Sequence, residues 1–154
     1  MNLGQRVPVG VGVVLKRDGH VLLGKRKGAH GAGQLALPGG KPDAGESPID
    51  AAKRELFEET GIKVPYFRTL PLWTYDRFQK EGLHYVTLYF VALCPPDATA
   101  VLREPEKCEG WQWIDPRDLW TNDLFVGAAQ AISEAFDTHI STRRYTGPGE
   151  WEIA

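Results

Sequence analysis

The sequence is poor in the features that would assign the protein to a specialised class. Its 154 residues include only two cysteines, Cys94 and Cys108, and these do not form a C-x-x-C pair. A disulfide framework or a thiolate metal site is therefore not expected. No segment approaches the roughly 18 consecutive apolar residues of a membrane span, and residues 1–7 lack the long apolar stretch of a signal peptide. These absences predict a cytoplasmic protein that has no membrane partner.

The chain also lacks an excess of charge of either sign, since 18 basic and 20 acidic residues give a net charge of −2. There is no basic field that would gather nucleic acid or an anionic membrane. The apolar content of 42% and the charged content of 25% are those of a soluble globular protein. Without repeats or a linker, residues 1–154 are expected to form a single domain, whose partner is a small-molecule substrate rather than a polymer.

The pattern of apolar residues predicts more strands than helices. The expected strands are Val7–Leu15, Val21–Gly24, Gln34–Leu37, Tyr66–Tyr75, Leu83–Leu93 and Trp111–Ile114. The first is a nearly continuous apolar run, which is typical of a strand buried on both faces. Asp18-Gly19 predicts the turn of a hairpin between the first two strands, whereas Pro38-Gly39-Gly40 is expected to end the third strand.

Two helices are expected, over Pro48–Thr60 and Asn122–Phe136. Ser47 can cap the first helix and Gly61 occupies the position of a C-terminal glycine. Because strands and helices follow one another in mixed order, the sequence favours an α/β fold of the α+β kind, with helices on the faces of a mixed sheet, over a doubly wound parallel sheet. Residues 141–154 are either a tail or pack on the domain through Tyr145 and Trp151.

Three glutamates give the first helix its chemical interest. Glu55, Glu58 and Glu59 are three and four positions apart, so they share one helix face. Like charges at this spacing weaken an isolated helix, which a positive ion would offset. Hard oxygen ligands suit Mg²⁺ or Mn²⁺, and Mg²⁺ usually binds substrate phosphates as well. The motif therefore indicates metal-dependent chemistry at a phosphate ester or anhydride.

The neighbouring residues strengthen this interpretation. Arg54 can pair with a carboxylate and fix its rotamer, and Glu46 precedes the helix and can return to the same face. Gly39 and Gly40 let the chain bend sharply and bring a backbone carbonyl close to a metal. Glu-x-x-Glu-Glu alone is more typical of a solvated acidic face, but the complete spacing over residues 40–62 is not.

The segment Gly40–Ile62 resembles the Nudix box, with Gly40, Glu46, Arg54-Glu55-Leu56, Glu58-Glu59 and Gly61-Ile62 at its defining positions. The resemblance implies a mixed α/β/α sandwich, a loop–helix–loop motif and metal-dependent hydrolysis of nucleoside diphosphates linked to another group. It also implies that Glu55, Glu58, Glu59 and the carbonyl of Gly39 are metal ligands, which Arg54 and Glu46 orient. Some family members take a general base from a later loop, and among Glu104, Glu106 and Glu109 we favour Glu104.

Further segments are similar to the MutT-like nucleoside triphosphate diphosphatases, especially the branch of the mammalian MutT homologues. They are Val9–Val14, Leu22–Gly28, Leu37–Gly40, His84–Thr87 and Glu104–Glu109, and the likeness covers most of residues 7–136. This resemblance implies cleavage of a nucleoside triphosphate to the monophosphate and pyrophosphate, a role in nucleotide-pool sanitation and, since several members are dimers, allows a homodimer. The substrate-binding residues that it implies are Arg26 beside the phosphates and Leu37, Gly40, Thr87, Phe125 and Gly127 elsewhere in the site.

Two departures leave the base preference open. Ala36 stands where that branch has an amide side chain, and Val126 stands where it has an aromatic ring. A Nudix pyrophosphatase acting on ADP-ribose or another nucleoside diphosphate-linked compound is the alternative enzyme, although Arg77 replaces the proline that ADP-ribose members tend to carry. A non-catalytic nucleotide-binding module is a third reading, which the retained glutamates disfavour.

Overall fold

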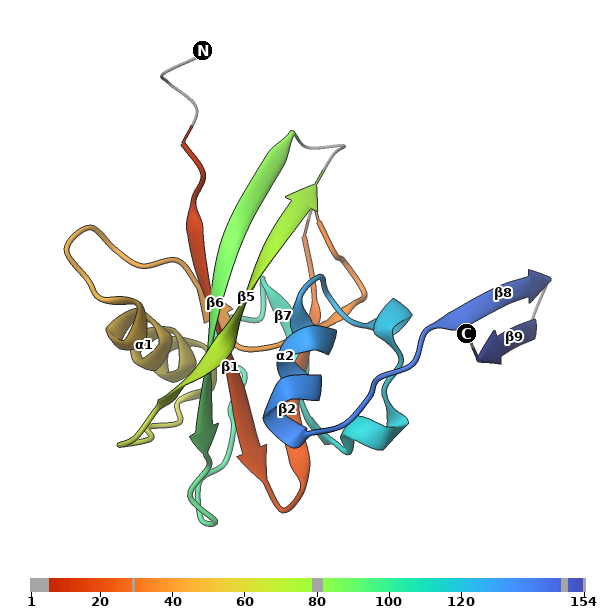
Figure 1. The fold of residues 1–154 in the computed structure, drawn as a ribbon. Coiled ribbons are helices and arrows are strands. Elements are labelled where there is room, and N and C mark those ends of the chain that lie inside the picture. Colours follow the sequence, from red (N-terminus) through yellow and green to blue (C-terminus); the bar gives the residue numbers. More distant parts are fainter. Residues whose placement is uncertain (1–5, 29, 79–81, 148–149, 154) are drawn as a thin grey trace.

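A mixed β-sheet lies between two helices in the computed structural model, which describes residues 6–28, 30–78, 82–147 and 150–153 (Figure 1). The strands of this sheet are β1 Val9–Arg17, β2 His20–Arg26, β3 Leu35–Ala36, β4 Gly39–Gly40, β5 Arg68–Phe78, β6 Leu83–Leu93 and β7 Cys108–Ile114. Their order is β3-β2-β1-β6-β5, with β4 paired to β1 and β7 paired to β2. Helices α1 Pro48–Thr60 and α2 Ala128–Phe136 complete the sandwich. The predicted fold class is confirmed.

Strand β1 is the centre of the sheet. It runs parallel to β6, from the pair Val9 and Val86 to the pair Lys16 and Leu93, and antiparallel to β2 and β4. Residues 11–15 are all buried. Because β-strand side chains alternate between faces, a strand buried on both sides needs an unbroken apolar run, as the sequence predicted. The strand begins two residues later than expected.

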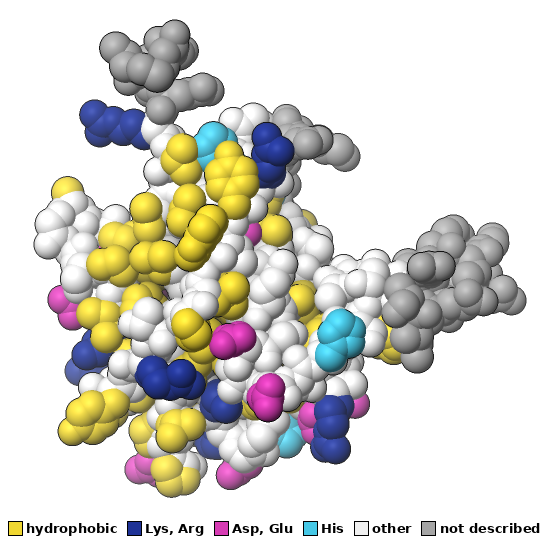
Figure 2. Space-filling model, viewed as in Figure 1, with side chains coloured by type: hydrophobic (Ala, Val, Ile, Leu, Met, Phe, Trp, Pro, Cys, Tyr) yellow, Lys and Arg dark blue, Asp and Glu magenta, His cyan; other side chains and the backbone are white. Residues whose placement is uncertain are grey.

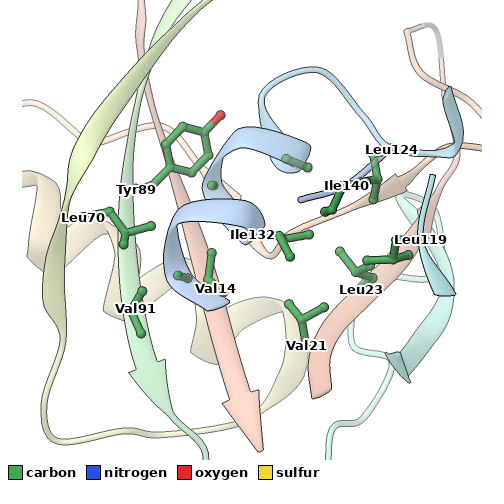
Figure 3. Packing of buried hydrophobic residues seen from close by; sticks show 13 residues of the cluster. Val14, Val21, Leu23, Leu70, Tyr89, Val91, Leu119, Leu124, Ile132 and Ile140 are labelled. Atoms are coloured by element: carbon green, nitrogen blue, oxygen red, sulfur yellow. The ribbon is translucent and has the colours of Figure 1, made fainter. Parts of the chain in front are cut away.

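The two faces of the sheet carry separate hydrophobic cores. Val14 packs with Ile132 and other residues of α2 on one face, and Figure 3 shows these side chains between the helix and the sheet, with Tyr89 near one end of the cluster. Val13 and Leu15 point the other way and pack with Leu56 and two alanines of α1. The sheet therefore fixes α1 against one face and α2 against the other.

Helix α1 spans the predicted residues. Ser47 Oγ accepts a hydrogen bond from the Asp50 amide at 3.2 Å, and Gly61 ends the helix with a φ of 75°. These contacts satisfy orphan groups at both helix ends. Since Ala51, Ala52 and Leu56 are buried against the sheet, the helix cannot rotate, and the direction of its glutamates is set.

The predicted start of the second helix at Asn122 is wrong. Residues Thr121–Asp123 form a 3₁₀ turn (η3), the Phe125 amide donates to the Leu35 carbonyl at 2.8 Å, and α2 begins only after Gly127, whose φ is 85°. A positive φ cannot continue a right-handed helix. Another 3₁₀ turn, η2, covers Pro116–Asp118.

The third expected strand lies where the sequence predicted it, but the glycines that follow it do not leave the sheet. Gly39–Gly40 forms β4 and pairs with Val11 and Gly12 of β1. Strands β5 and β7 are also displaced from the expected ranges, running to Phe78 and starting at Cys108. The pairing of β4 with β1 anchors Gly39 and Gly40 to the centre of the sheet beside α1.

The C-terminal segment forms its own two-stranded hairpin, β8 Arg143–Gly147 with β9 Glu150–Ile153. Residues 148 and 149 and the side chains beyond Arg143 lie outside the described part, and so does the choice between the two predicted alternatives, a tail or packing through Tyr145 and Trp151. Among the described helices, none is both long and apolar enough to cross a membrane.

Candidate active site

A cavity of about 210 Å³ lies between α1, β4 and the chain that precedes β7. We call it the carboxylate cavity, because Glu55, Glu59 and Glu104 line it together with Lys107, Gly39, Gly40 and Arg26. The structure thus brings two glutamates of the helical motif together with the favoured glutamate of the later loop.

The two glycines of β4 make this arrangement sterically possible. A β-carbon at Gly40 would collide with the Glu55 carboxyl group, and a β-carbon at Gly39 would collide with the Val11 carbonyl. The Gly39 amide donates a hydrogen bond to Glu59 Oε2 at 3.3 Å. Backbone and carboxylates therefore approach more closely than any other residue pair at 39 and 40 would allow.

Arg54 holds several carboxylates at once. Its Nε and Nη2 donate to the two oxygens of Glu46 at 2.9 and 3.0 Å. Its Nη1 donates to Glu55 Oε1 at 3.0 Å and to Glu58 Oε2 at 3.1 Å. These contacts raise the pKa of Arg54, mainly through Glu46, and lower that of Glu46. A planar guanidinium with several fixed donors suits this positioning better than an ammonium group.

The buried carboxylates are expensive to ionise without a cation. Burial raises the pKa of Glu59 to about 8, and the neighbouring Glu55 adds to the effect. Burial also raises the pKa of Glu55, although the hydrogen bond from Arg54 opposes it. Raised carboxyl pKa values inside a cavity are a mark of a functional site, and a bound cation would reverse them.

Glu58 lies apart from these two. It is held by Arg54, its side chain is 48% exposed, and it does not line the carboxylate cavity. Across the described ranges, no three histidine, cysteine or acidic side chains gather as a complete metal-binding cluster. Mg²⁺ usually takes only one or two protein carboxylates and fills its other positions with water and phosphate, so Glu55 and Glu59 fit such an ion.

The three candidate bases are separated clearly. Glu104 Oε2 accepts from Lys107 at 3.1 Å, while its Oε1 is buried and has no hydrogen-bond partner among the described residues. Glu106 is exposed, and Glu109 pairs with Lys25 at 3.4 Å. Of the three, only Glu104 lines the cavity.

A second cavity, of about 300 Å³, adjoins the first. We call it the aromatic cavity, because Phe78, Tyr85, Tyr89 and Phe125 line it together with His30, Asp76 and Thr87. The rings of Phe78 and Phe125 are stacked, with centroids 5.6 Å apart. The two cavities share Arg26, Ala36, Leu37, Gly39 and Gly40.

The predicted substrate-binding residues mostly meet at this junction. Arg26 donates to the His30 carbonyl and lies over the Phe125 ring, and burial lowers its pKa. Leu37, Gly40, Thr87 and Phe125 line the aromatic cavity, whereas Gly127 is beneath it at the start of α2, where a β-carbon would meet the Tyr89 hydroxyl. The two departures from the branch, Ala36 and Val126, also face this cavity.

Sequence reasoning missed the partner of Thr87. The hydroxyl of Thr87 on β6 donates to Asp76 Oδ2 at 2.7 Å, so an aspartate of β5 is its hydrogen-bond partner. Along β5 the sequence alternates, and Leu70, Thr74 and Asp76 fall on the buried face. The sequence did offer one indication of this partner. In the period-two pattern of β5, polar residues follow apolar ones on the inner face.

A NUDIX domain model matches residues 6–135, and this match includes the helical motif and both cavities. The chain belongs to the Nudix family. An 8-oxo-dGTP diphosphatase from Haemophilus influenzae is 42% identical, with 73% of this chain and 79% of the relative covered. An RNA pyrophosphohydrolase from Bartonella quintana is 41% identical, with 74% and 78% covered. A MutT NUDIX hydrolase from Burkholderia pseudomallei superposes with a TM-score of 0.77 at 32% identity, with 84% and 98% covered.

This Nudix hydrolase is therefore of the MutT type, an enzyme that hydrolyses pyrophosphate bonds in nucleotide substrates. Nudix hydrolases generally use divalent metal ions. The geometry agrees with both properties, since buried carboxylates adjoin a ring-lined space. The parts that individual residues play remain predictions.

Proposed function

We propose that this Nudix hydrolase cleaves nucleoside triphosphates to the monophosphate and pyrophosphate with Mg²⁺, for which Mn²⁺ can substitute, and so serves nucleotide-pool sanitation. The observation that carries the proposal is the junction of the two cavities. A nucleotide has an anionic phosphate end and a planar aromatic base. The carboxylate cavity with its proposed metal suits the phosphates, and the adjoining aromatic cavity suits the base. Their common wall contains Arg26, the one side chain of the wall with a positive charge.

The donor set suits the proposed metal. The metal would be held by Glu55 and Glu59 together with Glu58 and the Gly39 carbonyl. Hard oxygen donors at a phosphate site are typical of Mg²⁺. When bound, the metal supplies positive charge that neutralises the phosphates and lowers the pKa of water. Arg54 keeps Glu46, Glu55 and Glu58 in fixed rotamers, so the carboxylates need not reorganise during the reaction.

The remaining residues act on the substrate and on the attacking water. Arg26 binds the phosphates from the common wall of the two cavities. Glu104 Oε1, which lacks a protein partner, accepts the proton of a water whose oxygen bonds to phosphorus as the bond to the leaving pyrophosphate breaks. Lys107 keeps the other oxygen of Glu104 in place. Phe78 and Phe125, whose rings stack on each other, line the space that receives the base.

The deciding experiment is a substrate panel with Mg²⁺, in which pyrophosphate and phosphate are assayed separately. The panel contains the eight common ribo- and deoxynucleoside triphosphates, an oxidised dGTP, ADP-ribose and a dinucleoside polyphosphate. Monophosphate plus pyrophosphate from one or a few triphosphates is the expected result. AMP plus ribose phosphate from ADP-ribose alone would replace the substrate assignment, and tight binding without turnover would point to the regulatory module.

The proposal extends to a cytoplasmic homodimer. Trp73, Tyr75 and Leu83 are 64%, 48% and 40% exposed, and Figure 2 shows hydrophobic side chains gathered over the region of β5 and β6. Strand β5 is the last in the sheet order, and an apolar sheet edge favours association with another chain. Light scattering at micromolar protein should give the dimer mass, and a monomer mass would contradict this part.

A further inference from the structure

Asp76 is an unusual residue for the wall of a ring-lined cavity. It lies on the buried face of β5, is only 4% exposed and lines the aromatic cavity. Aspartate is disfavoured in strands and is almost never buried unless it is paired. A buried carboxyl group at this position therefore requires partners for both of its oxygens.

The protein supplies a partner for one oxygen only. Oδ2 accepts from the Thr87 hydroxyl at 2.7 Å, which fixes the rotamer of the carboxylate. Oδ1 is buried and has no hydrogen-bond partner within the described residues. Leaving a buried acceptor unsatisfied is destabilising, so an acceptor retained in a cavity wall indicates that a bound molecule completes it.

Two hydroxyl groups close to Asp76 are already paired with one another. Thr74 Oγ1 and the Tyr89 hydroxyl are 2.8 Å apart. The backbone of Gly127 closes against them, leaving no room for a β-carbon. Within the described residues, Asp76 Oδ1 and His30 Nδ1 are thus the polar atoms of this lining that are buried without a hydrogen-bond partner.

The surrounding rings define the shape of that ligand. Phe78 stacks on Phe125, and the His30 ring lies 5.1 Å from Phe78 at an angle of 33°. Tyr85 meets Phe78 edge-on at 5.8 Å. Flat walls of this kind favour a planar heteroaromatic group, and a carboxylate oxygen at their border favours an N–H donor on its edge.

We propose that Asp76 is a specificity-determining residue whose unpaired Oδ1 accepts a hydrogen bond from an exocyclic amino group of the bound nucleobase. The enzyme then favours bases that present a donor at this position over bases that present a carbonyl oxygen, which a carboxylate repels. The inference rests on the proposed function in taking a nucleotide as the ligand, and it adds the chemistry by which the base is selected.

The test measures binding, so that it does not depend on turnover. Calorimetry on the metal-free protein compares CMP with UMP and AMP with IMP, pairs in which a carbonyl replaces an amino group. We expect the amino member of at least one pair to bind about ten- to a hundredfold more tightly. Asp76→Asn should bring that ratio close to one, because an amide can donate as well as accept. Asp97→Asn, on an exposed loop residue, is the matched control and should keep the ratio.

The outcomes separate this inference from the proposed function. Equal affinities within both pairs, undetectable binding, or an unchanged ratio in a folded Asp76→Asn protein would each overturn it. If Asp76→Asn does not fold, Asp76→Ser serves instead, with the same expected loss of preference. An Asp76-dependent preference in an enzyme that cleaves no triphosphate would sustain the inference and refute the proposed reaction, and pyrophosphate release without that preference would do the reverse.

Discussion

The two adjoining cavities differ in how the chain builds them. In the carboxylate cavity, the two glycines and the two helical glutamates come from one continuous segment, residues 39–59, while β2, the residues around β3 and the chain from Leu102 to Trp111 supply the rest of the wall. The aromatic cavity collects its wall from β1, the residues around β3 and β4, strands β5 and β6, and the loop before α2. The carboxylate pair of the first cavity is therefore grouped by a local segment, whereas the rings of the second cavity meet only after distant strands have paired.

This difference indicates which property of the enzyme, turnover or base preference, a substitution in each cavity should change. The carboxylate cavity depends on helix periodicity, a glycine pair and one arginine, so a change there should affect every substrate alike. The aromatic cavity depends on side chains that can be exchanged without moving the reacting groups. Substitutions in the first cavity should lower turnover at constant base preference, and substitutions in the second should change the preference.

The largest effect is expected from Glu59→Gln. This change removes the most buried carboxylate of the site but keeps an oxygen that can accept from the Gly39 amide. Turnover should fall by about 10³-fold for every substrate, because a neutral amide is a poor ligand for the metal. Steady-state kinetics over the panel measure this, with circular dichroism to verify the fold.

Glu58→Gln tests the assignment of the metal ligands at a second carboxylate. The family resemblance implies that Glu58 is a metal ligand. We therefore expect the substitution to lower turnover by orders of magnitude as well, although Glu58 is half-exposed and held by Arg54. Near-normal turnover in both variants would contradict the assignment of the carboxylates. A change in the ratio between bases would contradict the separation of the two cavities.

Glu104→Gln is expected to have the next largest effect. If Oε1 takes the proton from the attacking water, turnover should fall by about 10²-fold, the lower end of the range typical of general base catalysis. Glu106→Gln is the matched control, since Glu106 is exposed in the same loop, and it should remain near the wild-type rate. The prediction is wrong if the two variants have similar rates at each pH tested.

Arg54→Lys should have a smaller effect, through the carboxylates that Arg54 positions. An ammonium group cannot make the double contact with Glu46 while also reaching Glu55 and Glu58. We expect turnover to fall by about 10- to 100-fold and half-saturation to need more metal. Activity measured over a Mg²⁺ titration tests this, and an unchanged titration curve would exclude a positioning role.

The same local and long-range division explains what the sequence could predict. The bounds of α1 follow from Ser47, Gly61 and a buried stripe within thirteen residues, all of which act locally. The start of α2 does not, because the hydrogen bond from Phe125 to Leu35 and the bridge between Leu124 and Leu35 hold the chain beside β3 after the 3₁₀ turn. Gly127, whose φ is 85°, then separates these residues from the helix.

The site divides in the same way. Helix periodicity alone grouped Glu55 and Glu59, and the fold adds that both face the glycines of β4. Asp76 could not be assigned from sequence, because its contact with Thr87 depends on the register between β5 and β6. A register is set by pairing across the sheet, which no single segment specifies.

A further prediction concerns the stability of the metal-free protein rather than turnover. The pKa of Glu59 is raised to about 8 from its ordinary value of 4.5, so between these pH values the folded chain retains a proton that the unfolded chain releases. The free energy of unfolding should therefore fall as pH rises from about 4.5 to about 8, by at most about 1.4 kcal/mol per pH unit, and level off above. Thermal unfolding in chelator, at a series of pH values, measures this decline.

Addition of Mg²⁺ should oppose that decline, because the ligand carboxylates bind the ion only after they lose their protons. The rise in Tm on adding Mg²⁺ should therefore be larger at pH 8 than at pH 6. Glu59→Gln has no such proton, so its metal-free stability should vary less over this window, with a residual slope of the same sign from Glu55, whose pKa is also raised. Identical pH profiles for the wild type and Glu59→Gln would show that the carboxylate cavity is more open to water than its burial indicates, and would remove the main electrostatic difference between it and the aromatic cavity.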